Sequence, residues 1–378
     1  MMWTFLAVIG LLMATLPAAM FLRNLNGFRS LPSADDARPS AGDKPLEISI
    51  LIPARDEAGG IAAAIDAALA ATGANVEVVV LDDHSTDGTL EILQAKSAAD
   101  PRVRFASSQP LPESWNGKQY ACYQLSKLAR HPVWVFLDAD VRLQPTALLQ
   151  METYRQQQEL DLLSIFPKQI TGTISEKMII PLMHYVLLGF LPMDRMRSSR
   201  SPAFASGCGQ VFMTTANAYA ASGTHEAIAS SRHDGLKLPA AYRKQNLKTD
   251  VMDGTELASV RMYTNTGEVI RGVLKNATEG IASPRLIVPF SCLLIGANVL
   301  PWVTLVAGLL IGSVWTWGIS ILAILIGLVP RALAAIHFQQ SWIGTMLQSP
   351  AIVLFVTLQW VALINHLFGR QVAWRGRT

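Results

Sequence analysis

Uncharged apolar runs occupy both ends of the chain, and a more polar, periodic region separates them. Residues 1–22 contain no charged side chain, and an apolar run of that length is enough for a helix that crosses a bilayer. Residues 286–329 also lack charge and are long enough for two crossings, and residues 351–368 supply one more. The pattern therefore predicts a transmembrane anchor over 1–22 and about three membrane helices over 286–368, followed by a basic tail at 369–378.

Strand-like and helix-like segments alternate between residues 46 and 280, after a stretch at 23–45 whose Pro, Ser and Ala content is typical of a linker. The strand-like runs are LEISILIPA, VEVVVLDD, RVRFASS and VWVFLDAD, and the helical patterns include IAAAIDAALAAT and LEILQAKSAA. Strands that alternate with helices in this way are typical of a parallel sheet with helices on both faces. We therefore expect an α/β domain over 46–280.

Acidic residues follow three of these strands at the point where each strand ends. A buried strand cannot hold an unpaired carboxylate cheaply, so these acids belong at an opening. Ligands of open α/β sheets bind beyond the carboxyl ends of the strands, so we expect the acids to gather at one site. They are Asp56, Glu57, Asp82, Asp83, Asp138 and Asp140.

Composition narrows the classes of protein that this domain can belong to. Hydrophobic residues make up 51% of the chain and the mean hydropathy is +0.30, which predicts a membrane component. A formal charge of +3 without a long basic run argues against nucleic acid as a partner. The three cysteines are scattered, which indicates neither a disulfide framework nor a zinc site.

The chemistry of the acidic edge points to a nucleotide diphosphate held together with a metal ion. Neither the G-x-G-x-x-G fingerprint of dinucleotide folds nor the G-x-x-x-x-G-K-[ST] loop occurs after the first strand. Carboxylates spaced one residue apart, as in Asp138 and Asp140, suit a hard divalent cation such as Mg²⁺ or Mn²⁺, which can bridge to a diphosphate. The remaining acids can accept hydrogen bonds from a base and a ribose.

Four short motifs resemble the family 2 glycosyltransferases of GT-A fold in their order and approximate spacing. They are P-A-R-D-E at 53–57, D-D-H-S-T-D-G-T at 82–89, W-N-G-K at 115–118 and D-A-D at 138–140. The resemblance implies a metal-dependent, inverting transfer of a sugar from a nucleotide-diphosphate sugar, with a UDP-sugar favoured. It implies a nucleotide site made of Pro53, Ala54, Arg55, Glu57, Asp82, Asp83, Lys118 and Asp138, and a metal held by Asp140 together with Asp138.

Turn formation and helix capping are the alternative roles for Asp82 and Asp87, because D-G and S-T-D are ordinary turn sequences. We assign Asp87 to that structural role and Asp83 to the nucleotide. A solvated surface lysine is the alternative for Lys118.

The resemblance extends to the acceptor half, where the segment SGCGQVFMTTANAYAASGTHEAI is followed by Asp234. The family commonly has two acids at this place, so the resemblance implies that Asp234 is the general base; an N-cap before GLKLPAAYRK is the alternative. His225 is either an acceptor contact or a structural histidine. Arg261 and Tyr263 are further candidate acceptor-side residues that would close over the diphosphate; a salt-bridged strand arginine is the alternative for Arg261. The stretch around them resembles the R-M-Y region of bacterial enzymes that glycosylate carotenoid or hopanoid-type lipids, and the Q-x-x-R-W motif of polymer-making members does not occur.

Residues 178–194 are apolar and contain Pro181 and Pro192, which favours an interfacial segment through which a lipid acceptor reaches the site; a buried core helix is the alternative. Arg23 and Arg29 place the globular domain in the cytoplasm, on a multi-pass protein of the inner (plasma) membrane. A polyprenyl-phosphate sugar transferase, a nucleotidyltransferase and a non-catalytic membrane scaffold stay open as other functions.

Overall fold

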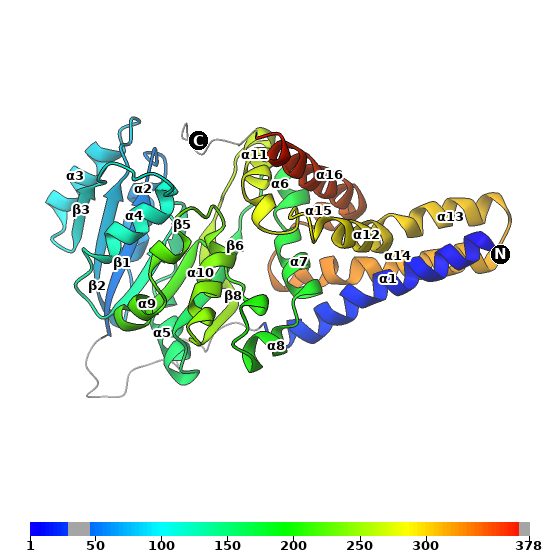
Figure 1. Cartoon of the computed structure of the whole chain (residues 1–378), viewed down its shortest axis with the longest axis horizontal. Coiled ribbons are helices and arrows are strands. Elements are labelled where there is room, and N and C mark those ends of the chain that lie inside the picture. The colour runs from blue at the N-terminus through cyan, green and yellow to red at the C-terminus, as the bar shows by residue number, and fades with distance from the viewer. Residues whose placement is uncertain (29–45, 370–378) are drawn as a thin grey trace. The chain divides into compact units, whose positions relative to one another are not determined.

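The computed structural model describes residues 1–28 and 46–369, which fall into two compact units (Figure 1). One unit, here called the sheet unit, holds residues 28–170 and 194–262. The other, the helical unit, holds residues 1–27, 171–193 and 263–378. The predicted linker at 23–45 and the predicted tail at 369–378 lie mostly outside the described residues. The predicted catalytic domain, 46–280, differs from the sheet unit, because residues 171–193 and those after 262 pack with the apolar helices.

The sheet unit is built on one eight-stranded sheet of order β3-β2-β1-β4-β7-β6-β8-β5. Its strands β3, β2, β1 and β4 are parallel, as predicted, but β7 is antiparallel to both of its neighbours and β5 is antiparallel to β8. The four strands predicted from the sequence are thus parallel as expected, and the strands that follow them make the complete sheet a mixed one. The strands are β1 (Leu46–Ala54), β2 (Ala74–Asp82), β3 (Val103–Ser107), β4 (Val133–Leu137), β5 (Val141–Leu143), β6 (Leu162–Gln169), β7 (Val211–Thr215) and β8 (Thr249–Val260).

Helices cover both faces of this sheet because successive strand residues point to opposite sides. Ile48, Ile50 and Ile52 of β1 enter one apolar cluster with α2 and α5, whereas Leu51 enters a second with α4 and α10. The helices of the unit are α2 (Ile61–Leu69), α3 (Thr89–Ala99), α4 (Gly117–Ser126), α5 (Ala147–Gln157), α8 (Met193–Ser198), α9 (Ala216–Ala221) and α10 (Asp234–Lys244). Two-sided burial explains the near-continuous apolar runs of β1, β2 and β4.

The helical unit contains helices long and apolar enough to cross a membrane. By length and composition there are three among the described residues, α1 (Met2–Leu25), α14 (Val314–His337) and α16 (Gln348–Leu367), and a fourth if the bent pair α12 (Ile287–Asn298) and α13 (Leu300–Leu310) is one span. The pair bends by 43°. The predicted anchor and C-terminal apolar region are thus found as helices. The remaining helices are α6 (Ile174–Ile179), α7 (Leu182–Phe190), α11 (Thr266–Asn276) and α15 (Trp342–Met346).

Residues 171–193 pack inside the helical unit, which matches the buried-helix alternative for the segment at 178–194. Asn24 of α1 fixes the end of α7, since its Nδ2 donates to Leu188 O at 2.8 Å and to Leu191 O at 2.6 Å. Along α7, six of the nine residues are buried: Leu182, His184, Tyr185, Leu187, Leu188 and Gly189.

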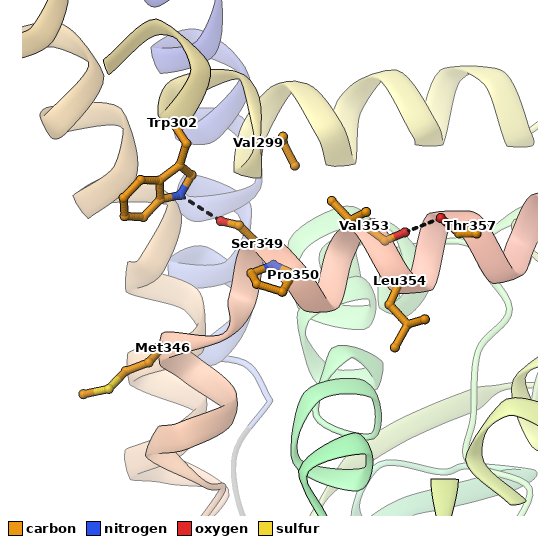
Figure 2. Close-up of a pocket in the computed structure, with 8 residues that line it drawn as sticks. All are labelled: Val299, Trp302, Met346, Ser349, Pro350, Val353, Leu354 and Thr357. Carbon is orange, nitrogen blue, oxygen red and sulfur yellow. Dashed lines mark hydrogen bonds between the residues drawn. The ribbon is translucent and has the colours of Figure 1, made fainter. Parts of the chain in front are cut away.

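An open apolar groove of about 610 Å³ lies in the helical unit, between the α12–α13 bend and the start of α16 (Figure 2). Trp302 Nε1 donates to Ser349 Oγ at 2.9 Å, and the Thr357 hydroxyl donates to Val353 O at 2.8 Å, as the dashed lines show. These polar groups are therefore already hydrogen-bonded within the protein. The full lining is Val299, Trp302, Met346, Ser349, Pro350, Val353, Leu354 and Thr357.

A buried carboxylate ties the edge of the sheet together. Glu77 of β2 is 6% exposed and accepts hydrogen bonds from Ser49 Oγ (2.6 Å), Arg130 N (2.6 Å) and Arg104 Nη1 (2.7 Å). Burial raises the pKa of Glu77, but these hydrogen bonds outweigh it and leave the pKa below its usual value. The ionised carboxylate therefore stabilises the folded sheet.

Replacing this carboxylate tests that contribution. Glu77→Gln is expected to lower the free energy of unfolding by roughly 1.5–3 kcal/mol, because charge-assisted hydrogen bonds are lost in a buried place. The measurement is thermal unfolding of the purified chain in detergent, with the exposed Glu47→Gln on β1 as the matched control. Because the folded pKa is lowered, the difference should be full at neutral pH and shrink as the pH falls below the usual glutamate value of 4.5. A difference that persists unchanged at lower pH would contradict the assignment.

Candidate active site

The ends of β1 and β2 form a single joined loop region. The Asp83 N–H donates to Ala54 O at 2.8 Å, and Arg55 Nη1 donates to Asp83 O at 2.7 Å. The same Nη1 lies 3.6 Å from Asp83 Oδ2, and both Asp82 and Asp83 are buried. The structure therefore brings together the residues predicted to line the nucleotide pocket: Pro53, Ala54, Arg55, Glu57, Asp82 and Asp83.

Asp87, two residues before α3, links the loop after β2 to the loop after β1. Its Oδ2 accepts from Ala58 N at 3.0 Å, and its Oδ1 accepts from the Thr89 hydroxyl at 2.6 Å. Asp56 adopts left-handed backbone, φ 51°, and accepts from Thr86 N at 2.8 Å. These bonds hold the two loops to each other, which is the turn-forming role expected of Asp87.

Lys118 lies at the centre of the candidate site. It is the second residue of α4, whose first turn is capped by Asn116 Oδ1 accepting from Lys118 N at 3.1 Å. Its Nζ lies 2.6 Å from Asp138 Oδ1 and 2.8 Å from Asp234 Oδ2, and it donates to Gly209 O at 3.1 Å. Burial lowers the pKa of Lys118, but the two carboxylates hold it well above its usual value, so the ammonium is charged.

This ion cluster joins three parts of the sequence that lie far apart, and it is partly accessible to solvent. The side chains of Lys118, Asp138 and Asp234 are 20%, 27% and 15% exposed to solvent, respectively. Asp138 follows β4, whereas Asp234 begins α10. The alternative of a solvated surface lysine does not describe Lys118, since all of its Nζ contacts are within the cluster.

Asp234 has both carboxylate oxygens in use. Oδ2 contacts Lys118, and Oδ1 accepts from Gly235 N at 2.8 Å, at the first turn of α10. Burial raises the pKa of Asp234, but Lys118 outweighs it and holds the pKa below its usual value, so the side chain is ionised and can accept a proton. His233, which the sequence places before it, is the N-cap residue and makes no side-chain capping bond.

Two glycines let α10 approach the loop before β7 closely enough for this contact. A Cβ on Gly209 would lie 2.0 Å from Asp234 Oδ1, and a Cβ on Gly235 would lie 2.8 Å from Gly207 O. Any side chain at either position would push Asp234 away from Lys118. Gly209 and Gly235 are thus required by packing rather than by backbone conformation.

Asp140 is the residue that best fits a metal ligand. Its Oδ1 is buried and has no hydrogen-bond partner, and burial together with the charges of Asp138 and Glu57 raises its pKa to about 7. A carboxylate held among like charges, with an unpaired oxygen, is suited to a divalent cation that neutralises them. Within the described residues no group of three His, Cys, Asp or Glu side chains is arranged around one point, so the protein would supply only part of the coordination shell.

Arg142, which the sequence reasoning missed, holds the loop of Asp138 and Asp140 in place. Its Nη1 donates to Ala139 O at 3.0 Å and to Val141 O at 2.9 Å, while Nη2 donates to Gly60 O at 2.8 Å before α2. The guanidinium therefore links the two loops that carry Asp140 and Glu57. An arginine two residues after the D-A-D motif was the signal available in the sequence.

The three residues assigned to the acceptor lie in different surroundings. His225 is 2% exposed, its Nδ1 lies 2.7 Å from Tyr219 Oη, and its ring packs edge-on against Phe136. Burial lowers the pKa of His225 to about 3, so the ring is neutral, and its place matches the structural alternative. Arg261 is exposed after β8 in the sheet unit, whereas Tyr263 belongs to the helical unit and packs near Gly272. The acceptor roles of all three stay predictions.

Comparison with known proteins matches this geometry. Residues 49–215, which carry Lys118, Asp138 and Asp140, match the model of glycosyl transferase family 2. The chain contains a family 2 glycosyltransferase domain. The matched residues include the four motifs on which the resemblance rested, so that prediction and the GT-A fold class that it implied are confirmed.

Curated relatives of this family 2 domain are bacterial enzymes. The chain is 27% identical over 260 residues to a 4,4'-diaponeurosporenoate glycosyltransferase of Staphylococcus haemolyticus, covering 68% of this chain and 67% of the relative. It is 29% identical over 220 residues to the enzyme of the same name from Staphylococcus aureus, covering 57% of this chain and 56% of the relative. The match to the second relative therefore spans little more than half of its length.

Solved structures that are similar in shape are also glycosyltransferases. A mannosyltransferase of Pyrobaculum calidifontis, solved with GDP-Man and Mn²⁺, has a TM-score of 0.49 at 14% identity, covering 97% of this chain and 100% of that one. Glucosyl-3-phosphoglycerate synthase of Mycobacterium tuberculosis, solved with Mn²⁺, UDP and product, has a TM-score of 0.40 at 18% identity, covering 65% and 84%.

Adding one methyl group at Gly209 tests the ion cluster. Gly209→Ala is expected to displace the Asp234 carboxylate and to lower turnover by on the order of 100-fold, as misplacement by about 1 Å at a reacting group can do. The measurement is the rate of nucleoside diphosphate release. Gly59→Ala is the matched control, because a Cβ there meets nothing within 4 Å. Equal loss in both variants would show that the effect is not local to Asp234.

Proposed function

We propose that the protein transfers a sugar from a nucleotide-diphosphate sugar to a membrane lipid, with inversion at the anomeric carbon. The observation that carries the proposal is the cluster of Lys118, Asp138 and Asp234, placed beside the unpaired Asp140 at the carboxyl end of β4. A cation, an ionised base and a metal-ligand carboxylate are the groups that such a transfer needs in one place.

The loops after β1 and β2 bind the nucleotide in this proposal. Asp83 accepts from the imide of a uracil, and Glu57 lies near the base or ribose. Arg55 holds Asp83 through its backbone carbonyl, at 2.7 Å, and so orients the loop. Lys118 is charged and lies at the start of α4, so it supplies positive charge to the diphosphate oxygens as the leaving group departs.

Asp140 and Asp138 are the residues that would hold a divalent cation, Mg²⁺ or Mn²⁺. When bound, such a cation neutralises negative charge on the departing diphosphate. Arg142 positions this loop through three hydrogen bonds to backbone carbonyls. Burial lowers the pKa of Arg142, but the guanidinium stays protonated.

Asp234 is the proposed general base for a hydroxyl acceptor. It takes the proton from the hydroxyl as the oxygen forms its bond to the anomeric carbon, and the bond from that carbon to the diphosphate breaks. The ammonium of Lys118 contacts the Asp234 carboxylate and lowers its pKa, so the carboxylate is ionised but is a weak base. It becomes a stronger base when the ammonium turns toward the diphosphate. Ligand binding and activation of the base are coupled through this one lysine.

A lipid acceptor is supported by two independent features. The curated relatives are named for a carotenoid acid, diaponeurosporenoate, which is a lipid-like acceptor. The chain also carries at least three helices that are apolar and long enough to span a bilayer. We therefore place the protein in the bacterial inner membrane as a multi-pass protein, with the family 2 domain in the cytoplasm.

The decisive experiment measures nucleoside diphosphate release by the detergent-purified protein with a panel of UDP- and GDP-sugars and a total lipid extract. One donor should give release that depends on lipid and is abolished by EDTA. Asp234→Asn should lower turnover by about 10²–10⁴-fold with a hydroxyl acceptor. Asp140→Asn should raise the concentration of Mn²⁺ or Mg²⁺ needed for half-maximal turnover.

Asp66→Asn on α2 is the matched control, because Asp66 is 59% exposed and pairs only with Lys96 on the surface. Transfer of labelled sugar to a polyprenyl phosphate rather than to another lipid would move the protein to the polyprenyl-phosphate class. No turnover with any donor, or Asp140→Asn with unchanged metal dependence, would refute the proposal.

A further inference from the structure

Arg331 is the single Asp, Glu, Lys or Arg residue between positions 286 and 369. It lies in the last turns of α14, one of the helices long enough to cross a membrane, and it is only 1% exposed. An ionisable residue inside a membrane-spanning helix is costly and commonly marks a functional site. Arg331 does not reach the surface of the helical unit, so its charge is not solvated there.

The guanidinium of Arg331 is poorly satisfied by the protein. Nε and Nη1 are buried and have no hydrogen-bond partner, and the bond from Nη2 to Lys177 O on α6 is long, at 3.4 Å. An arginine guanidinium carries five N–H donors, and it stays protonated in proteins. Among the described residues no carboxylate pairs with it.

Polar, uncharged side chains lie near Arg331 in the described part of the helical unit. Electrostatic coupling links it to His184 and Tyr185 of α7. His184 Nδ1 lies 3.0 Å from Gln340 Nε2, and the ring stacks on Phe338 at 4.3 Å between centroids. Gln340 Oε1 is another buried atom without a hydrogen-bond partner. The described residues therefore place polar groups near the positive charge of Arg331 but provide no negative charge to pair with it.

Close packing makes this arrangement specific. A Cβ on Gly344 of α15 would lie 2.9 Å from Arg331 Nη2 and 2.0 Å from Lys177 O, so glycine alone allows α15 to cover the guanidinium. Thr345 Oγ1 of the same short helix donates to Arg331 O at 3.3 Å. A buried charge without a partner destabilises a fold, and a retained one therefore indicates a ligand of opposite charge.

We propose that Arg331 binds the oxyanion of a lipid, a carboxylate or a phosphate, at a site formed by α6, α7, α14 and α15. Arginine matches both oxyanions through its planar donors. The site lies within the helical unit and does not depend on the transfer reaction. The oxyanion can come from an acidic bilayer lipid, from the acid group of an acceptor, or from free phosphate, and these sources share one chemistry.

The test compares acidic and neutral additives in a non-ionic detergent, with thermal unfolding of the full chain as the readout. The additives are oleate against oleyl alcohol, phosphatidylglycerol against diacylglycerol, and inorganic phosphate alone. We expect acidic lipids at about ten times their dissociation constant to raise the unfolding midpoint by about 2–4 °C, and neutral ones not to. If only oleate or only phosphatidylglycerol raises the unfolding midpoint, the bound group is a carboxylate or a lipid phosphate, respectively. If inorganic phosphate raises it, the site binds a free anion.

The variant that decides the matter is Arg331→Met, with Arg285→Met at the exposed start of α12 as the control. Without lipid, Arg331→Met should unfold at the same temperature as the parent or higher, because it removes an uncompensated charge and keeps an apolar side chain. With acidic lipid it should gain nothing, whereas Arg285→Met should respond as the parent does.

Equal shifts by oleate in the parent and in Arg331→Met would overturn the proposal, and so would equal shifts by oleate and oleyl alcohol in the parent. If Arg331→Met does not fold, Arg331→Lys takes its place. Lysine keeps the charge without the planar donors, so it should retain a preference for oleate over oleyl alcohol with about tenfold or more weaker affinity. Retention of acidic lipid by native mass spectrometry, stronger for the parent than for Arg331→Lys, is the independent readout; equal retention would count against the site.

Discussion

Lys118 supplies one positive charge to two carboxylates, and the geometry of the family 2 domain follows from that contact. Asp138 comes from the end of a parallel strand and Asp234 from the start of a helix more than ninety residues further along the chain, yet each lies within 2.8 Å of the same Nζ. Two half-buried carboxylates that contact the same Nζ would repel each other without the ammonium between them. The contact therefore decides where α10 begins relative to β4, and with it how Asp234 lies relative to the loop that carries Asp138 and Asp140.

Close packing of the backbone around Lys118, Asp138 and Asp234 also fixes the positions of these side chains. Gly209 and Gly235 bring a loop and a helix start into contact at distances that admit no side chain, while Lys118 donates to the Gly209 carbonyl as well. Arg142 plays the corresponding part on the other side, where it joins the D-A-D loop to the start of α2 by backbone carbonyls. The functional side chains thus rest on fixed backbone rather than on one another alone, which is what positions reacting groups to within a fraction of an ångström.

The two units differ in the hydrogen-bond partners that they provide to buried charged side chains. In the sheet unit the buried carboxylate of Glu77 has protein partners in Ser49, Arg104 and the Arg130 amide. In the helical unit the Arg331 guanidinium has, among the described residues, a single long hydrogen bond to a carbonyl, although its burial makes an unpaired charge costly. Asp140 is the one site residue with a comparable orphan oxygen, and there too the simplest physical account is a charged ligand. A buried charged group with an atom that lacks a hydrogen-bond partner therefore occurs in both units.

Local pattern alone determined a large part of this protein. Apolar runs predicted the helices at both ends, and two-sided burial of β1, β2 and β4 produced the continuous apolar strands from which the α/β class was read. The D-A-D spacing and the acids after β1 and β2 were visible because strand ends leave a signal in sequence. Tertiary structure alone decided the antiparallel placement of β7, the inclusion of residues 171–193 among the apolar helices, and the burial of His225. It also decided that Lys118 meets Asp234, that Gly209 must lack a side chain, and that Arg331 faces inward. These depend on contacts between residues far apart in the chain, which hydrophobic periodicity and short motifs do not encode.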